Sequence, residues 1–332
     1  MLFRQLLLVV ALTSTDGLSL HSYLAAHCRN AQHAAAVSAV AASAVEIASL
    51  LARAPIDGNL GGIGETSGDR DAQKPLDILS NEIMKTRLFG TGVVSWIATE
   101  EEDDPIASNI QVKSGLTVCF DPLDGSSNID CASPTGTIFS IADAADTESF
   151  RLRRGDELSC AGYVLYSSST ELVLALGRDQ GVCGFTLSRD SSEFVLARPN
   201  IKVPPRGQFY SLNDGRSSDW PTGLQRYIQD IKDGRGESGK RYSSRYVCSL
   251  VADVHRTLLY GGWAGNPRSH LRLLFEGAPL AFVLEAAGGA GTDGVSRLLS
   301  IQPSKVHHRL PVFLGSELDV RELQTYGDVQ QK

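Results

Sequence analysis

The feature that most constrains this chain is the way in which acidic residues follow its apolar runs. Residues 93–98 and 116–120 are apolar runs typical of buried strands. The pair Glu100-Glu101 follows the first run, and the segment Asp121-Pro122-Leu123-Asp124 follows the second. Carboxylates at strand ends can converge, and a hard divalent cation holds together carboxylates that would otherwise repel one another. The pattern therefore predicts a two-metal site where these strands end.

The residues directly after the second run add a phosphate-binding pattern. Pro122 fixes its own φ and favours a turn, which lets Asp121 and Asp124 face one cation. The same turn would free the carbonyl of Leu123 from strand pairing. Gly125-Ser126-Ser127 then offers backbone N–H groups and hydroxyls in a tight bend, which suits a phosphate opposite the metal ions. A solvated turn, the ordinary interpretation of a lone Asp-Pro pair, would leave the neighbouring acidic clusters unexplained.

Composition limits the partners of the chain. Its 332 residues are 42% hydrophobic, which allows a large core in one domain or two. The net charge of -7 argues against a nucleic-acid partner or an anionic membrane surface. Six cysteines without a CxxC spacing indicate neither a disulfide framework nor structural zinc. An anionic substrate would therefore need a local basic pocket.

Apolar periodicity predicts two helices before the acidic strands, over residues 34–54 and 76–88. Pro204-Pro205 interrupts the regular pattern near the middle of the chain and marks the predicted boundary between two units. The further predicted elements are strands at 137–141, 162–166, 172–176, 185–188 and 311–314, and helices at 221–231, 251–259, 280–287 and after Ser316.

The first residues have the pattern of a leader peptide. Arg4 precedes an apolar run over residues 6–12, and a polar stretch follows, as in a signal peptide. The run is shorter than the roughly 20 residues that a membrane-spanning helix needs. We therefore predict a signal or targeting segment over residues 1–20 and no membrane domain.

Four stretches carry a resemblance to a known family: DPLDGSSNID at 121–130, LDILSNE at 76–82, RYVCSLVADVHRTLLYGG at 245–262 and LRLLFE at 271–276. Together they resemble fructose-1,6-bisphosphatase of the class 1 family, over roughly residues 21 to 326. The DPxDG element is shared with inositol phosphatases, but the two later stretches are not. The resemblance implies an α+β fold in α-β-α-β-α layers, with an AMP-domain-like N-terminal sub-domain over 21–203 that carries most metal ligands. A C-terminal substrate-binding sub-domain would span 204–332.

The resemblance also implies which residues carry the chemistry. Metal ions, Mg²⁺ with Mn²⁺ as the alternative, would activate a water molecule for in-line attack on the 1-phosphate. Glu101 would act as general base through that water, and Asp77 would orient it. The implied metal ligands are Asp71, Glu100, Glu101, Asp121, the Leu123 carbonyl, Asp124 and Glu276. The implied substrate-binding residues are Asp124, Gly125, Ser126, Ser127, Asn213, Arg216, Arg245, Tyr246, His270 and Arg272.

The chain departs from the family pattern at the distal phosphate. Arg216 and Asn266 stand where the family has tyrosines, and His270 stands where it has a lysine. Histidine is a shorter and pH-dependent cation, whereas Arg216 adds a group able to form a bidentate phosphate contact. We expect lower affinity or a shifted choice of substrate. The resemblance implies that Arg245, which is retained, reaches into a neighbouring subunit, and therefore that the protein forms a homodimer or homotetramer.

The predicted function is hydrolysis of fructose 1,6-bisphosphate to fructose 6-phosphate and phosphate, in gluconeogenesis or the Calvin cycle. A sedoheptulose-1,7-bisphosphatase is the nearest alternative, and a catalytically weak regulatory homologue is the next. The leader together with this chemistry favours a plastid reached through the secretory route, and the cytosol is the alternative.

Overall fold

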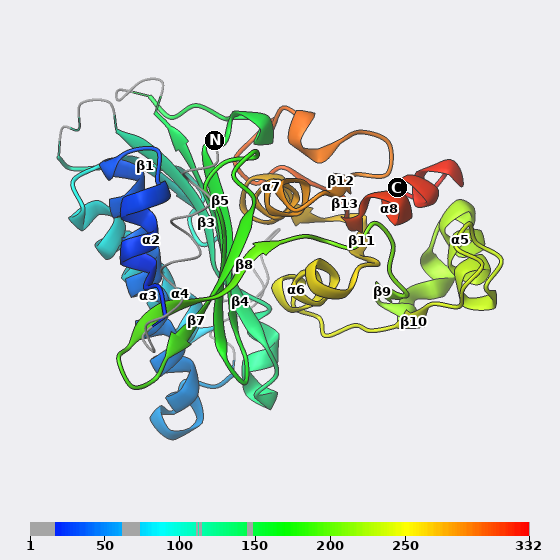
Figure 1. Ribbon diagram of the computed structural model, residues 1–332, viewed down its shortest axis with the longest axis horizontal. Coiled ribbons are helices and arrows are strands. Elements are labelled where there is room, and N and C mark those ends of the chain that lie inside the picture. Colours follow the sequence, from blue (N-terminus) through cyan, green and yellow to red (C-terminus); the bar gives the residue numbers. More distant parts are fainter. Residues whose placement is uncertain (1–16, 62–73, 111, 113–114, 145–148, 332) are drawn as a thin grey trace.

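The structure is a computed structural model that describes residues 17–61, 74–110, 112, 115–144 and 149–331. Most of the predicted leader and the predicted metal ligand Asp71 lie outside the described residues. Within the described residues the chain forms two β-sheets and three layers of helices (Figure 1).

The first helical layer consists of α2 (Leu20–His27), α3 (Ala31–Asp57) and α4 (Pro75–Gly90), which cover one face of the larger sheet (Figure 1). Asn30 caps α3 by accepting a hydrogen bond from the His33 N–H, and Gly58 ends the helix with a φ of 75°. Among the described helices, only α3 is long and apolar enough to cross a membrane, by length and composition alone. Its inner face packs in the first core cluster, as expected for the core helix of a globular protein.

The larger sheet has eight strands in the order β2-β1-β3-β4-β5-β6-β7-β8. β1 and β3 run parallel, and the other neighbours are antiparallel. The parallel pair brings the ends of the two predicted acidic strands to one edge. The strands are β1 (Val94–Thr99), β2 (Ile106–Ala107), β3 (Leu116–Asp124), β4 (Thr135–Asp143), β5 (Cys160–Tyr166), β6 (Thr170–Ala175), β7 (Val182–Ser188) and β8 (Glu193–Ile201).

The smaller sheet has five strands in the order β10-β9-β11-β13-β12. The chain passes from one sheet to the other between Ile201 and Phe209, a segment that contains Pro204-Pro205. α6 and α7 lie between the two sheets, and α5 and α8 lie on the outer side (Figure 1). The elements are β9 (Phe209–Ser211), α5 (Thr222–Asp233), β10 (Ser243–Ser244), α6 (Leu250–Tyr260), β11 (Trp263–Arg272), α7 (Ala278–Ala286), β12 (Gly289–Thr292), β13 (Arg309–Ser316) and α8 (Glu317–Thr325).

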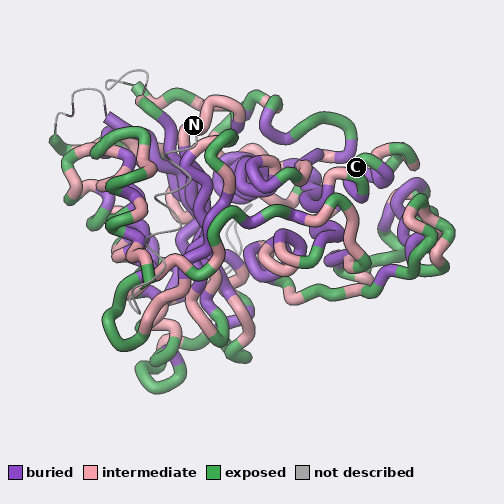
Figure 2. Tube along the Cα trace, in the orientation of Figure 1, coloured by how far each residue is buried: buried purple, intermediate pink, exposed green. Residues whose placement is uncertain are grey.

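Three main core clusters follow these layers, and buried residues run through the middle of the molecule (Figure 2). The first cluster lies between α2–α4 and the larger sheet, the second between the sheets around α6 and α7, and the third under α5 and α8. The predicted α+β layered arrangement is therefore confirmed.

The predicted turn at Asp121-Pro122-Leu123-Asp124 was wrong. β3 continues to Asp124, and its register with β4 shifts between Asp121 and Asp124, so that the strand bulges. A bulge accommodates a proline because it removes the need for the missing N–H in the ladder. The Thr137 hydroxyl donates to the Pro122 carbonyl at 2.8 Å. The sharp bend comes one residue later, at Gly125 with a φ of 74°, where a 3₁₀ helix (Ser126–Cys131) begins.

Sequence patterns missed helix α2 and six strands, β2, β8, β9, β10, β11 and β12. Helix α2 begins inside the predicted leader, at Leu20. β8 alternates irregularly and contains Pro199, and β11 contains Gly265, Asn266 and Pro267, which are typical of turns. Both strands owe their extended form to the neighbouring strands with which they pair.

Candidate active site

A cavity of about 420 Å³ lies where the two sheets approach each other. It is lined by residues of both halves of the chain, from Lys74 to Ser127 and from Ser211 to Glu276. All predicted site residues within the described part of the chain line this cavity except Arg245. The sequence therefore indicated most of the wall of one cavity, although the residues come from distant segments.

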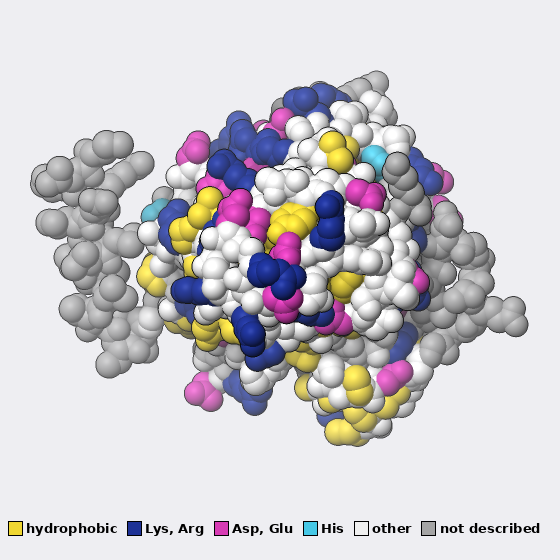
Figure 3. All heavy atoms as spheres, turned by 90° about the vertical axis from the view of Figure 1, so that its right-hand side faces the viewer, with side chains coloured by type: hydrophobic (Ala, Val, Ile, Leu, Met, Phe, Trp, Pro, Cys, Tyr) yellow, Lys and Arg dark blue, Asp and Glu magenta, His cyan; other side chains and the backbone are white. Residues whose placement is uncertain are grey.

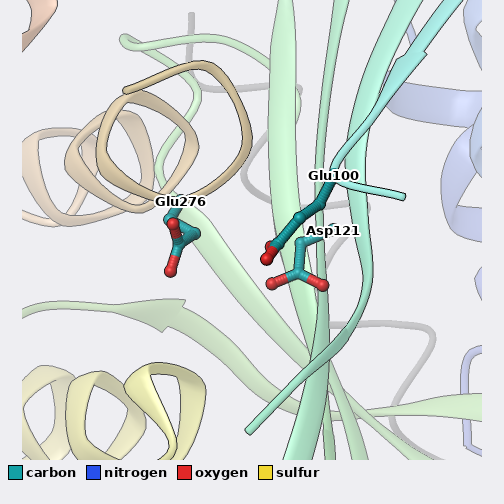
Figure 4. A group of neighbouring side chains, drawn as sticks. All are labelled: Glu100, Asp121 and Glu276. Carbon is teal, nitrogen blue, oxygen red and sulfur yellow. The ribbon is translucent and has the colours of Figure 1, made fainter. Parts of the chain in front are cut away.

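Three carboxylates converge at one end of the cavity. Glu100 follows β1, Asp121 lies in β3, and Glu276 lies in the π-helical turn Leu273–Gly277 between β11 and α7. One oxygen of each lies within 4.8 Å of the others, and the three side chains project into the same space (Figure 4). Asp121 and Glu276 are buried, with 4% and 5% exposure. We refer to these three residues as the carboxylate cluster.

Burial raises the pKa of Asp121 and of Glu276 well above the usual range, and the charge of Glu100 raises both further. The Arg272 guanidinium forms an ion pair with Glu100, and the Arg272 N–H donates to Glu276 at 2.6 Å. Three carboxylates face a single guanidinium, so a divalent cation would complete the charge balance. The oxygen donors match the preference of Mg²⁺, and the residues present therefore fit the predicted metal site.

Asp124 lies close enough to this cluster for its charge to raise the pKa of Asp121 and of Glu276, and it also contacts the N-terminus of α6. Its carboxylate accepts hydrogen bonds from the Ser249 hydroxyl at 2.7 Å, the Val251 N–H at 2.9 Å and the Leu250 N–H at 3.3 Å. Burial raises the pKa of Asp124 to about 6, and these bonds oppose the rise. Asp124 thus ties the larger sheet to α6.

The two predicted catalytic carboxylates are Asp77, in the first turn of α4, and Glu101, which follows β1. Asp77 is buried and accepts a hydrogen bond from the Lys74 N–H at 2.7 Å. Burial raises its pKa to about 6, while the bonds from Lys74 and Ser126 lower it. Glu101 is half-buried and lines the cavity, and its N–H donates to the Thr99 hydroxyl at 3.4 Å.

Glu102 links the turn after β1 to α4. Its carboxylate accepts hydrogen bonds from Asn81 at 3.1 Å and from Lys85 at 2.7 Å, both on α4. Asn81 in turn accepts from the buried Thr99 hydroxyl at 2.9 Å. This network fixes the turn that carries Glu100 and Glu101.

The phosphate-binding segment Gly125-Ser126-Ser127 lines the cavity beside the cluster. A side chain at position 125 would place its Cβ 2.8 Å from the Cβ of Ser249. The positive φ and this close approach both require glycine there. Asp121 accepts a hydrogen bond from the Leu123 N–H at 2.9 Å, which holds the bulge and the carboxylate together.

The other end of the cavity is lined by Asn213, Arg216, Tyr246, Asn266 and His270. Sequence reasoning did not assign Arg268 here, nor Cys248 and Ser249 elsewhere in the cavity wall. Arg216 is half-exposed and lies 3.8 Å from Asp219. We refer to this part of the cavity as the distal end.

Arg245 lies outside the cavity of its own chain. It is exposed, its guanidinium donates to the Ser244 carbonyl at 2.8 Å, and it lies 5.5 Å from the Phe209 ring centroid. Acidic and basic side chains intermingle on the outer face of the C-terminal half (Figure 3). The cavity, rather than this face, offers the local basic site that an anionic substrate needs.

Comparison with known proteins identifies the family. Residues 25–199 match the model of the fructose-1-6-bisphosphatase N-terminal domain, and residues 203–328 match that of the C-terminal domain. This chain belongs to the fructose-1,6-bisphosphatase family. It is 44% identical to chloroplastic fructose-1,6-bisphosphatase of Brassica napus over 314 residues, which cover 87% of this chain and 76% of the relative.

Two further relatives agree with this assignment. The chloroplastic fructose-1,6-bisphosphatase of Spinacia oleracea is 43% identical over 87% of this chain and 75% of its own. The crystal structure of Leishmania major fructose-1,6-bisphosphatase in holo form superposes with a TM-score of 0.88 at 32% identity, over 94% of this chain and 99% of that one.

Membership of this family confirms the predicted class of enzyme, a phosphatase of a metal-dependent, sugar-bisphosphate family. The names of the relatives do not favour the sedoheptulose alternative. The plant relatives are chloroplastic, which supports the predicted plastid location and a role in carbohydrate metabolism.

Proposed function

We propose that this chain hydrolyses the 1-phosphate of D-fructose 1,6-bisphosphate in a reaction that requires Mg²⁺. The observation that carries the proposal is the carboxylate cluster at one end of a cavity whose distal end offers arginine side chains. A bisphosphate needs this arrangement, because only one of its two phosphates reacts and the other must be held. The products are fructose 6-phosphate and phosphate, in the Calvin cycle of a plastid or in gluconeogenesis.

Mg²⁺, with Mn²⁺ as the alternative ion, would be held first by Glu100, Asp121 and Glu276. When bound, the ions supply an activated water nucleophile and neutralise the oxygen that leaves with the sugar. The further predicted ligands within the described residues are Glu101, the Leu123 carbonyl and Asp124, all at the wall of the cavity. Asp71, the remaining predicted ligand, lies outside the described residues.

The chain's own residues would move the proton and hold the substrate. Glu101 accepts the proton of the attacking water, and Asp77 orients that water. The pKa of Asp77 near 6 and its fixed bond to the Lys74 N–H suit a group that positions a water near neutral pH. The N–H groups and hydroxyls of Gly125-Ser126-Ser127 hold the reacting phosphate. The predicted contacts to the rest of the substrate are Asn213, Arg216, Tyr246, His270 and Arg272.

The proposal includes the two sub-domains, 21–203 and 204–332, and an assembly of at least two chains. Arg245 is exposed beside Phe209 and does not line its own cavity, which supports a role at the cavity of a neighbouring copy. The assembly would be a homodimer or homotetramer, with no nucleic-acid or membrane partner.

The test is phosphate release by the purified protein with fructose 1,6-bisphosphate and Mg²⁺. Glu101→Gln should lower kcat by at least about 100-fold, the usual value of a general base, while the protein stays folded. Glu82→Gln, on the exposed side of α4, is the matched control and should keep full activity. A Glu101→Gln variant with near-normal turnover would contradict the assignment of Glu101 as the general base.

Substrate choice is tested by comparing kcat/KM for fructose 1,6-bisphosphate and sedoheptulose 1,7-bisphosphate. The fructose substrate should give the higher value. No Mg²⁺-dependent phosphate release from either substrate would instead point to a regulatory homologue without activity.

A further inference from the structure

One cationic side chain at the distal end was not assigned by the sequence motifs. Arg268 lies in the irregular part of β11, where the register with β13 shifts between Asn266 and Leu271. It lines the main cavity and also an adjoining cavity of about 30 Å³. Its N–H donates to the Asn266 side chain at 3.1 Å, which fixes the local backbone.

Arg268 differs from the other long cations of the cavity in its charge balance. Lys74 is paired with Asp130 at 2.8 Å, Arg272 with Glu100, and Arg216 with Asp219 at 3.8 Å. In the part of the chain that the structure describes, no carboxylate forms an ion pair with Arg268. The half-buried Arg268 therefore brings to the cavity a positive charge that no described carboxylate balances, and an anionic ligand would balance it.

The C-terminal segment holds the backbone of Arg268 in place. Gln331 forms a parallel bridge with Arg268, and the Gln331 N–H donates to the Pro267 carbonyl at 2.8 Å. Val329 anchors this segment in the third core cluster, with 1% exposure. The side-chain oxygen of Gln331 is buried without a hydrogen-bond partner among the described residues, next to the cavity that Arg268 also lines. It is an acceptor that a guanidinium N–H can satisfy.

We propose that Arg268, positioned by the main chain of Gln331, binds the phosphate of the substrate that does not react and so sets the preference for bisphosphates over monophosphates. This inference rests on the proposed function, because it names a residue that recognises the same substrate. A guanidinium binds phosphate through two parallel N–H bonds and stays charged at every physiological pH, so Arg268 gives this contact a strength that His270 alone would lack.

The first test is binding without chemistry. Isothermal titration calorimetry with fructose 6-phosphate, which carries only the distal phosphate, measures this contact in the absence of metal. Arg268→Gln should raise Kd by about 10- to 100-fold, the effect of removing a charge-assisted hydrogen bond. The Kd of Arg268→Lys should lie between those of the wild type and Arg268→Gln, because lysine keeps the positive charge but cannot form the two parallel N–H bonds of a guanidinium. Arg321→Gln, an exposed arginine on α8, is the matched control and should bind as the wild type does.

The second test separates recognition from a structural role. For wild type and Arg268→Gln, kcat/KM is measured with fructose 1,6-bisphosphate and with fructose 1-phosphate, which lacks the distal phosphate. The variant should lose about 10- to 100-fold on the bisphosphate, through KM, and less than about twofold on the monophosphate. A merely structural residue would lower both values together.

The role of Gln331 is tested by two substitutions. Gln331→Pro removes the N–H that reaches Pro267, whereas Gln331→Ala keeps it. The proline variant should weaken fructose 6-phosphate binding about fivefold or more, and the alanine variant should weaken it less.

The inference is overturned if Arg268→Gln leaves the Kd for fructose 6-phosphate within twofold of the wild type, or if both substrates lose kcat/KM equally. A wild-type protein that binds fructose 6-phosphate through Arg268 but releases no phosphate would contradict the proposed function and support this inference.

Discussion

The two ends of the cavity are built in different ways. At the carboxylate cluster, Asp121 and Glu276 are buried and fixed by backbone hydrogen bonds, on a strand and on the turn before α7. At the distal end, Arg216 and Tyr246 are exposed by 51% and 43%, on irregular segments of the chain. The cluster is rigid and can fix a reaction geometry, whereas the distal end can change its contacts at little cost in stability. Chemistry and substrate choice should therefore respond differently to substitution.

The largest expected effect is at the cluster. Asp121→Asn keeps the shape of the side chain and removes one of the three charges, so phosphate release should fall by about 1000-fold, equivalent to several kcal/mol of transition-state stabilisation. The Tm of the metal-free protein should rise, because a repulsive buried charge is gone. Activity assays and thermal unfolding without metal check the two effects. Asp104→Asn, in the exposed loop after β1, is the control and should change neither.

The second effect is a pH dependence of stability at the junction between the two sheets. Both ends of the cavity depend on this junction for their relative position. His255 of α6 forms a hydrogen bond of 2.9 Å with the Tyr163 hydroxyl of β5, and burial lowers the pKa of His255 to about 4. Between pH 6.5 and 4 the unfolded chain therefore binds a proton that the folded chain does not, and stability falls as the pH falls. The loss should reach about 2–3 kcal/mol at pH 4.5.

His255→Gln removes the titrating group and keeps a hydrogen-bonding side chain for Tyr163. Urea unfolding of both proteins at pH 7 and pH 4.5 should show a smaller pH dependence in the variant. Equal pH dependence in the two proteins would mean that other groups cause the acid sensitivity.

A smaller effect on stability is expected where Asp124, beside the carboxylate cluster, contacts the N-terminus of α6. Ser249 donates to Asp124 at 2.7 Å and caps α6 by accepting from the Ala252 N–H at 3.3 Å. Ser249→Ala should lower the free energy of unfolding by about 1–2 kcal/mol, as for other N-cap losses. Ser300→Ala, which removes an exposed hydrogen bond from the Ser300 hydroxyl to the Arg297 carbonyl, is the control. Chemical denaturation compares the two variants, and equal losses would show that the link to Asp124 adds nothing.

The smallest effect is expected at Arg216. Because this side chain is half-exposed and faces Asp219, Arg216→Gln should raise KM for fructose 1,6-bisphosphate only about two- to fivefold, with kcat unchanged. Steady-state kinetics at fixed Mg²⁺ measure it. A loss as large as that of Arg268→Gln would mean that Arg216 is the main contact of the distal phosphate.

Local patterns were enough to predict the cluster end, because strand ends and acidic residues lie close together in the sequence. Glu100 and Asp121 come from parallel neighbouring strands, so their convergence followed from the strand pattern. Glu276 did not, since it lies in a π-helical turn that no apolar period reveals, and only the resemblance to a family placed it. The bulge at Pro122 depends on pairing with β4, which local sequence does not show.

The distal end could not be predicted in the same way. Arg268 reaches the cavity because β11 is interrupted and because Gln331, 63 positions later in the printed sequence, packs beside it. Ser249 and Cys248 reach the wall because α6 packs against β4. These contacts arise from the packing of two sheets, and tertiary packing leaves no periodic signal in the chain.

The central claim is that the carboxylate cluster is a divalent metal site on which phosphate release depends. Its most direct measurement is the rate of phosphate release from fructose 1,6-bisphosphate by purified wild-type protein, first with a chelator and then during titration with Mg²⁺. Release should be absent in chelator and should rise to saturation with Mg²⁺ in the wild type, but not in Asp121→Asn. An equal rate of release in chelator and in Mg²⁺ would contradict the account.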